Sequence, residues 1–167
     1  GPPELRWLQT VVAGMGVALE NARLFDQTQA ALQRQTASAD ILRVISQSPT
    51  DVMPVVEVIV ATARRLLGCY RTAFLRRDGD SLVSMRVATE VGGVEPGRVT
   101  RIPLNPSHNF PSRALASSSP LHLPDWSAIE LTEHEREVQR TSGCHASLML
   151  PLLRGSDKEP LGVLVFQ

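Results

Sequence analysis

The sequence predicts an α+β domain, in which a central antiparallel sheet of about six strands is flanked by helices and preceded by a long N-terminal helix. Apolar residues near the start recur every three or four positions, which is the period of a helix that buries one narrow stripe. After Gly68 the apolar residues form short runs separated by turn residues, which is typical of strands. Short helical patterns interrupt these runs midway, and together these observations favour α+β over a purely helical fold.

The first helix is predicted to run from Leu5 towards Pro49. Its apolar positions have near-heptad spacing, and the sequence contains no glycine or proline between Val17 and Ser48. Such a narrow stripe is typical of helices that pair along a seam, so we expect a homodimer formed through the N-terminal helices. The expected seam consists of Leu5, Leu8, Val12, Met15, Leu19 and Ala22.

The next elements are a second helix, a hairpin and a third strand. Thr50 or Asp51 is expected to cap the second helix, which carries Pro54 in its first turn and ends at Gly68. Strands are predicted at 69–75 and 82–88, joined by a turn that contains Asp78-Gly79. Residues 90–97 are rich in glycine and acid and predict an exposed loop, and residues 98–104 predict a short strand.

The second half of the chain alternates loops, short helices and strands. Residues 105–119 predict a loop around a short helix at 111–116, and residues 121–123 predict a short strand. We expect Asp125 to cap the turn that leads to Trp126. The charged segment 132–140 predicts a short, mobile helix, and its Thr132–Glu137 run is interpreted as a solvated face. The apolar runs 146–153 and 161–166 predict the last hairpin.

Composition excludes several classes of partner. The 17 lysines and arginines balance 17 aspartates and glutamates, so no excess charge favours nucleic acid. The apolar runs are shorter than the ~20 residues that span a bilayer, so we expect no membrane contact by this segment. The two cysteines, Cys69 and Cys144, do not make a disulfide scaffold, which favours a reducing, cytoplasmic location.

Five stretches, in their order and spacing, resemble the GAF domain, a small sensory fold common in bacterial signalling proteins. The stretches are Thr36–Val52, Arg64–Tyr70, Leu121–Asp125, Ala146–Leu153 and Leu161–Leu164. The resemblance implies a GAF domain at 36–167 that lacks its C-terminal helix, since the chain stops within a predicted strand. Residues 4–25 are similar to the last helix of a preceding GAF domain, so 1–35 is interpreted as a linker helix. The parent protein is expected to be a bacterial sensor histidine kinase or nucleotide cyclase.

The resemblance also suggests where a ligand binds. In GAF domains the insertion in the middle of the domain lines a ligand cavity, and His108 and Phe110 lie in the corresponding segment. We expect a cavity lined by Phe74, Met85, His108, Phe110 and Trp126. Arg113 is a further candidate, either meeting an anionic ligand at the cavity mouth or remaining solvated.

The histidines, the cysteines and the serines are further candidates for a metal, cofactor or catalytic site. The four histidines have no shared spacing, so no metal site is predicted. Cys144-His145 is similar to the pair that anchors a linear tetrapyrrole in phytochrome-like GAF domains, but it lies directly before a strand, where a buried packing role is the alternative. No activated serine or phosphate-binding loop is present, so no catalytic residue is assigned, and no cofactor is required by the sequence.

Three functions follow from these expectations. The first is a sensory GAF domain that binds a small molecule and relays the signal through helices to an effector. The second is a dimerisation spacer without a ligand. The third is a tetrapyrrole or haem sensor. None of the three is an enzyme in its own right.

Overall fold

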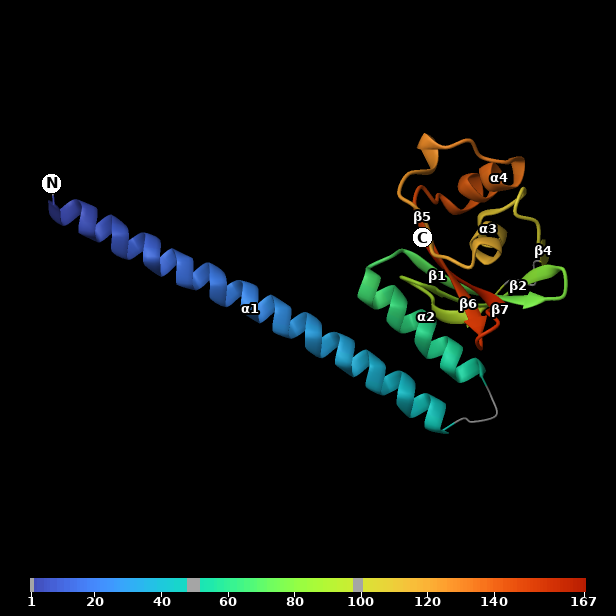
Figure 1. Ribbon diagram of the computed structural model, residues 1–167, viewed down its shortest axis with the longest axis horizontal. Helices are drawn as coiled ribbons and strands as arrows, with labels where there is room; N and C mark the ends of the chain where they lie inside the picture. The colour runs from blue at the N-terminus through green and yellow to red at the C-terminus, as the bar shows by residue number, and fades with distance from the viewer. Residues whose placement is uncertain (1, 48–51, 98–100) are drawn as a thin grey trace. The chain divides into compact units, whose positions relative to one another are not determined.

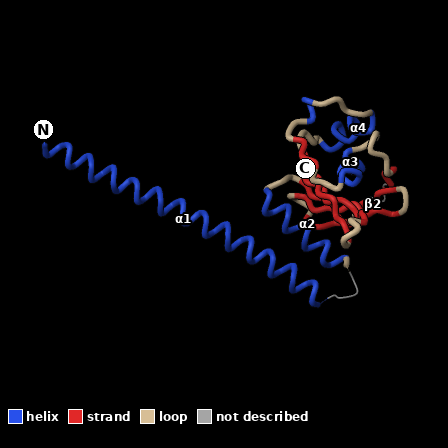
Figure 2. Tube along the Cα trace, viewed as in Figure 1, coloured by secondary structure: helices blue, strands red, loops and turns tan. Residues whose placement is uncertain are grey.

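The computed structural model describes residues 2–47, 52–97 and 101–167, and divides the chain into two compact units between Arg43 and Val44. It confirms an α+β fold with an antiparallel sheet and a long N-terminal helix (Figures 1 and 2). Among the described helices, none combines the length and the apolar content that a membrane span requires.

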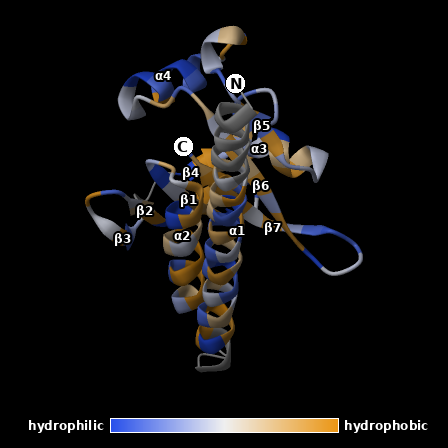
Figure 3. Cartoon of the chain, turned by 90° about the vertical axis from the view of Figure 1, so that its left-hand side faces the viewer, coloured by the Kyte–Doolittle hydropathy of each residue, from blue (hydrophilic) through white to orange (hydrophobic). Residues whose placement is uncertain are grey.

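Helix α1 (Pro2–Gln47) has 46 residues and makes up nearly all of the first unit, and its last residues, from Val44 onwards, are assigned to the second unit. An Arg23–Glu20 ion pair one turn apart supports this helix, with 2.6 Å between Nη2 and Oε1. Three residues of the predicted seam have described side chains, and all are exposed: Met15 at 60%, Leu19 at 70%, and Ala22. Apolar and polar residues are mixed along α1 (Figure 3). The side chains of Leu5, Leu8 and Val12 lie outside the described ones, and the dimer stays a prediction.

Helix α2 (Met53–Leu67) has a proline in its first turn and a glycine at its C-cap. Pro54 occupies the first turn, and the helix ends at Gly68 with φ +62°, a conformation that glycine adopts without steric cost. Val52 is the N-cap and makes no side-chain capping bond, and the expected caps, Thr50 and Asp51, lie outside the described residues. Val56 and Val60 bury the apolar face of α2 against the sheet.

The sheet contains seven described strands, and every pair is antiparallel. Its order is β3-β2-β1-β7-β6-β5, with β4 also beside β2. The predicted first hairpin is confirmed, because Asp78 pairs with Ser81 around a two-residue turn in which Gly79 has φ +60°. The strands are β1 (Arg71–Asp78), β2 (Ser81–Thr89), β3 (Gly93–Pro96), β4 (Arg101–Pro103), β5 (Leu121–Leu123), β6 (Ser147–Arg154) and β7 (Glu159–Phe166).

One predicted loop is wrong. Residues 90–97 were expected to be irregular, but Gly93–Pro96 form β3 and pair with β2. Most β3 residues are exposed, because an edge strand pairs on one side only and needs no apolar face, so its composition resembles that of a loop. The strand predicted at 98–104 is present as the shorter β4, and residues 98–100 lie outside the described ones.

Helices cover the two faces of the sheet differently (Figure 1). Helix α2 packs on one face, in a core that includes Phe74, Leu164 and Phe166. The other face is covered by α3 (Phe110–Ser117), the short 3-10 helix η1 (Trp126–Ala128) and α4 (Glu133–Ser142). Both predicted helices of this second half are confirmed, and each is longer than expected. The face that carries α3 and α4 holds the candidate site.

Candidate functional site

A cavity of about 280 Å³ lies between the sheet and the helices α3 and α4. Strands β1, β6 and β7 supply apolar side chains to its floor, and α3, η1 and α4 supply its walls and roof. Its apolar lining residues are Ala73, Leu75, Ile102, Phe110, Pro111, Trp126, Val138, Met149 and Val165. Its polar lining residues are Arg71, Ser84, Asn109, His134, Glu135, Thr141, Ser142 and Gln167. Most of the surface that these residues present to the cavity is apolar, as is common in ligand sites of proteins.

Asn109 fixes the start of α3 and so places Phe110 in the cavity wall. Its side-chain oxygen accepts a hydrogen bond from the backbone N–H of Ser112 at 2.9 Å, which caps the helix. Its side-chain nitrogen donates to the carbonyl of Pro103, also at 2.9 Å. Asn109 and Phe110 are both buried. Both ends of the Asn109 amide are thus used within the protein.

Trp126 closes the cavity beside Phe110. Asp125 caps the turn as predicted, because it accepts from the backbone N–H of Ser127 at 2.8 Å. The hydroxyl of Ser127 and then its N–H hold the pKa of the Asp125 carboxyl below its ordinary value. The Trp126 indole is only 2% exposed, and its Nε1 donates to the Ser147 hydroxyl at 3.1 Å. Its ring meets that of Phe110 edge-to-face, with 4.9 Å between centroids.

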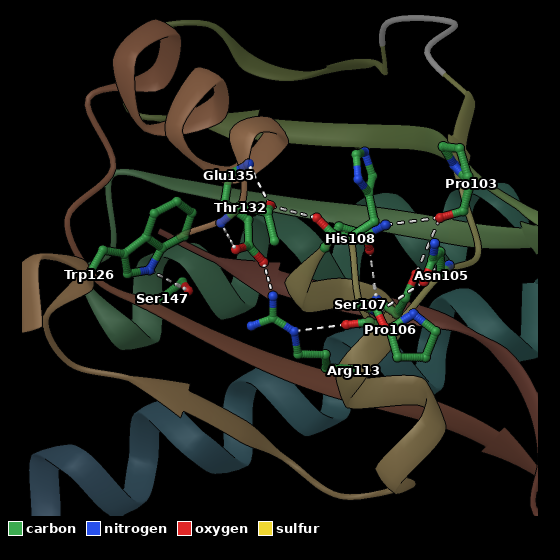
Figure 4. A network of polar contacts seen from close by, with 12 residues as sticks. Pro103, Asn105, Pro106, Ser107, His108, Arg113, Trp126, Thr132, Glu135 and Ser147 are labelled. Atoms are coloured by element: carbon green, nitrogen blue, oxygen red, sulfur yellow. Dashed lines mark hydrogen bonds and ion pairs between the residues drawn. The ribbon is translucent and has the colours of Figure 1, made fainter. Parts of the chain in front are cut away.

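A polar clasp holds α4 to α3 over the cavity, and we define it as Arg113, Thr132, Glu135 and His108 (Figure 4). Glu135 is 1% exposed, and its carboxylate accepts from Arg113 Nη2 at 2.5 Å and from the backbone N–H of Thr132 at 2.8 Å. The Thr132 hydroxyl accepts from the Glu135 N–H and donates to the carbonyl of His108 at 2.8 Å.

The clasp corrects the interpretation of the Thr132–Glu137 run as a solvated face. Thr132 and Glu135 form a reciprocal capping box, and the Glu135 side chain is buried. The sequence carried the signal for this arrangement, since threonine followed three residues later by glutamate is the pattern of such a box. The buried Arg113–Glu135 ion pair has no local pattern, because its partners lie 22 residues apart.

Arg113 is part of this clasp and does not line the cavity. Besides Glu135, its Nε donates to the carbonyl of Pro106 at 2.9 Å. Its guanidinium carbon lies 4.5 Å from the centroid of the Phe110 ring, in cation–π geometry. The structure therefore shows Arg113 in a structural position, and its role towards an anionic ligand stays a prediction.

Two of the histidines meet, although no convergence was expected. The rings of His108 and His134 stack with 4.9 Å between centroids and 25° between planes. Burial of His134, followed by the neighbouring His108, lowers the pKa of His134. His134 lines the cavity and His108 does not. In the described part of the chain, no three histidine, cysteine, aspartate or glutamate side chains gather as a metal site.

Of the predicted cavity residues, Phe110 and Trp126 line the cavity, whereas Phe74 and Met85 lie on the other face of the sheet. Side chains alternate along a strand, so Ala73 and Leu75 face the cavity and Phe74 between them faces α2. Ser84 lines the cavity, so its neighbour Met85 faces α2 by the same alternation. The expectation that one cavity holds all these residues is wrong.

Both cysteines are free and have polar neighbours. The Cys144 thiol is buried, donates to the Ala146 carbonyl at 3.1 Å, and has a pKa raised by burial. The Cys69 sulfur lies 3.2 Å from the Thr72 hydroxyl. A buried thiol with a raised pKa is a poor nucleophile, and this favours the packing role for Cys144.

Comparison with known proteins gives a family and a fold. A family model described as GAF domain matches residues 51–167. The structure is similar to free methionine-R-sulfoxide reductase from Neisseria meningitidis in complex with its substrate, at 23% identity over 83% of this chain and 74% of that chain, with a TM-score of 0.61. No curated protein sequence matches the chain.

Two further solved structures share this fold. One is the GAF domain of a phosphoenolpyruvate-protein phosphotransferase from Acinetobacter, at 16% identity over 81% of this chain and 76% of that chain, with a TM-score of 0.59. The other is the phycocyanobilin-bound GAF domain of a cyanobacterial phytochrome, at 17% identity over 79% of this chain and 78% of that chain, with a TM-score of 0.61.

Proposed function

Because this chain belongs to the GAF domain family, we propose that it is a sensory module which binds a small molecule in the cavity beneath α4. The observation that carries the proposal is the cavity of about 280 Å³ itself, walled by apolar side chains and roofed by a helix held through a polar clasp. A ligand that prefers one arrangement of the roof shifts the population towards that arrangement.

The relay from cavity to helices runs through β1. Ala73 and Leu75 line the cavity, and Phe74 between them packs in the α2 core with Val56 and Val60. A shift of β1 caused by a ligand therefore changes the packing of α2. Helix α2 follows α1 in the chain, so we propose that the signal leaves through these helices.

We further infer the setting of this module from the resemblance of residues 36–167 to GAF domains of signalling proteins. The parent is a bacterial multidomain protein of the sensor histidine kinase or cyclase type, with tandem GAF domains and a cytoplasmic location. The module itself performs no catalysis. The Neisseria relative is named a reductase, but at 23% identity the likeness shows a shared fold alone.

A second candidate function is a dimerisation spacer without a ligand. The exposed apolar side chains of α1 favour it, because their burial against a second copy of the helix would stabilise a dimer. They include Met15, Leu19, Leu24, Phe25 and Leu32. The two functions are compatible if the dimer forms through α1 and the ligand binds beneath α4. A tetrapyrrole sensor, the third candidate, is disfavoured by the burial of Cys144.

A thermal-shift screen of metabolites tests ligand binding, because a ligand that binds only the native state raises the Tm. The screen compares the unaltered chain with Ala73→Leu, which fills the cavity from its floor. Phe74→Leu is the matched control, since it loosens the same strand on the opposite face. A ligand that stabilises the unaltered chain and Phe74→Leu, but not Ala73→Leu, supports the proposal. If no compound stabilises the chain and it forms a stable dimer, the spacer function replaces it.

A further inference from the structure

We propose that Ser84 is the polar anchor of the cavity, and that the cavity takes a small, neutral, mainly apolar molecule whose hydroxyl or carbonyl group forms a hydrogen bond with the Ser84 hydroxyl. This inference rests on the proposed function and names the class of ligand. Its basis is a buried hydroxyl without a partner, on a residue that lines a cavity with a mostly apolar surface.

The Ser84 hydroxyl is an exception to the hydrogen bonding of the domain. Among the residues that the structure describes, Ser84 Oγ is the one buried side-chain nitrogen or oxygen that forms no hydrogen bond. A buried hydroxyl has lost its bonds to water, and without a replacement this loss destabilises the native state. Buried polar groups in proteins nearly always have a partner, so a missing one needs an explanation. A ligand that supplies the missing bond is such an explanation.

Ser84 lies on the cavity face of β2, at the bulge of the β1–β2 ladder. It pairs with Leu75, whose side chain also lines the cavity. A Cβ on Gly97 would collide with Ser84 Oγ, so the backbone of Gly97 fills the space on that side. The Gly97 N–H is not a partner either, because it donates to the Met85 carbonyl at 3.1 Å. A partner has room in the cavity, towards which the hydroxyl can turn by a change of χ1 rotamer.

The other two hydroxyl groups of the cavity lining are already used within α4. The Thr141 hydroxyl donates to the Glu137 carbonyl at 2.8 Å. The Ser142 hydroxyl donates to the Val138 carbonyl at 2.7 Å and accepts from a backbone N–H of the next turn. Ser84 therefore differs from both, since its hydroxyl can donate and accept without breaking a bond of the protein.

The surroundings of Ser84 favour a neutral ligand group over a charged one. A single hydroxyl does not replace the water that an ionised group loses on burial. Arg71, the arginine of the lining, lies about 13 Å from Leu75 along β1 at the usual rise of a strand. The buried carboxylate of Glu135, which also lines the cavity, repels an anion. The rest of the ligand is apolar because most of the cavity surface is apolar.

The test uses four probes built on one benzene ring. An apolar cavity of roughly 150 Å³ binds benzene, so a cavity of about 280 Å³ has room for a substituted ring. Ethylbenzene has no polar atom, whereas acetophenone and 1-phenylethanol carry a carbonyl or a hydroxyl group at the same carbon of the side chain. Benzoate carries a carboxylate in place of the acetyl group of acetophenone. The rise in Tm with probe concentration, measured by scanning calorimetry, gives each dissociation constant.

The dissociation constants are compared in the unaltered chain, in Ser84→Ala and in Ser81→Ala. Ser81→Ala is the matched control, because Ser81 lies on the same strand and does not line the cavity. We expect Ser84→Ala to weaken acetophenone, 1-phenylethanol or both by roughly threefold to tenfold relative to ethylbenzene. Ser81→Ala should leave this ratio unchanged, and Ala73→Leu should abolish the binding of every probe. In the unaltered chain, benzoate should bind roughly tenfold or more weakly than acetophenone.

A second measurement separates ligand binding from a structural role of the Ser84 hydroxyl. Because this hydroxyl has no partner, Ser84→Ala should leave the unfolding free energy of the free chain unchanged or raise it. Ser147→Ala should lower it, because the Ser147 hydroxyl is the acceptor of Trp126 Nε1. Urea unfolding measures both, followed by Trp126 fluorescence in a Trp7→Phe background that leaves Trp126 as the only tryptophan.

Four results overturn the inference. They are unchanged affinity ratios in Ser84→Ala, equal binding of benzoate and acetophenone, no binding by any of the four probes, and a loss of stability in free Ser84→Ala as large as in Ser147→Ala. In each case the proposed function stands if the metabolite screen yields a ligand whose stabilisation is lost in Ala73→Leu. If that screen also detects no binding in the cavity, the inference and the ligand-binding function fail together.

Discussion

The buried Arg113–Glu135 pair should respond unequally to the removal of its two partners. The Glu135 side chain is 2% exposed and that of Arg113 is 34% exposed. In Glu135→Gln the remaining guanidinium is still reached by water. In Arg113→Met the remaining carboxylate is buried without its main partner, which is the costlier situation. We therefore predict that Arg113→Met destabilises the fold more than Glu135→Gln.

The magnitudes follow from the contacts that each substitution removes. Glu135→Gln replaces a charge-assisted bond to Arg113 but keeps an acceptor for the Thr132 N–H, so we expect a loss of about 2 kcal/mol. Arg113→Met leaves a buried carboxylate and also removes the cation–π contact to Phe110, and we expect about 3–4 kcal/mol. At roughly 2–4 °C per kcal/mol, the two Tm values should differ measurably.

Urea unfolding followed by Trp126 fluorescence in the Trp7→Phe background measures these free energies. The double variant should lose at least about 1 kcal/mol less than the sum of the single losses, because the residues interact directly. Arg140→Met and Glu137→Gln form the matched control on the same helix, where the ion pair is exposed and each change should cost about 0.5 kcal/mol or less. The clasp is refuted as a structural element if the losses of unfolding free energy in Arg113→Met and Glu135→Gln add up in the double variant. It is also refuted if these losses are no larger than those of the control pair.

Three further outcomes are expected. Ser147→Ala should cost about 1–2 kcal/mol, because it leaves the buried Trp126 Nε1 without an acceptor. Ser127→Ala removes only the exposed hydroxyl bond to Asp125 and should cost less, so equal Tm losses in the two variants would contradict this explanation. The pKa of His134 in the native state lies below its ordinary value of 6.5. Below pH 6.5 the unfolded chain therefore takes up a proton on His134 more readily than the native chain does. The contribution of neutral His134 to stability is fully present above pH 6.5 and is lost as pH falls through the lower native pKa. His134→Gln should therefore flatten the slope of unfolding free energy against pH below about 6.5 in urea titrations, and an unchanged slope would count against this origin. The paired substitutions Met15→Glu and Leu19→Glu place charge in the predicted seam and should make the chain monomeric in sedimentation. Asn21→Glu is the control on the same helix. A dimer that persists in the paired variant would eliminate this seam.

The sequence predicted the elements better than it predicted which faces they present. The glycine turn at Asp78-Gly79, the glycine stop at Gly68 and the two closing apolar runs rest on local chemistry, and each is present in the structure. Strand β1 is different, because Thr72 to Leu75 are all buried. A strand covered on both faces shows no alternation, so the sequence gives no sign that Ala73 and Leu75 face the cavity while Phe74 faces α2.

The missed parts of the site depend on contacts between distant segments. The capping box of Thr132 and Glu135 was readable from their spacing, but the partner that makes Glu135 a buried acid is Arg113 in another helix. The stack of His108 on His134 likewise joins a loop to a helix that is far along the chain. Such pairs are fixed only once α3 and α4 have docked on the sheet, so single-sequence patterns do not contain them.

The position of β1 between the cavity and α2 restricts how a signal can cross the sheet. On one side β1 pairs with β2 through a ladder that contains a bulge, and on the other it pairs with β7 in regular register. A side chain on Gly162 of β7 would collide with the Leu75 carbonyl and would come within 3.0 Å of Phe74 Cε2, so β7 has no room for a side chain at this point beside β1. On the β1–β2 side, the pairing shifts between Phe74 and Leu75. Leu75 lines the cavity and Phe74 packs with α2. The proposed relay therefore predicts that a ligand which displaces Leu75 changes the packing of the α2 core at this point of the sheet.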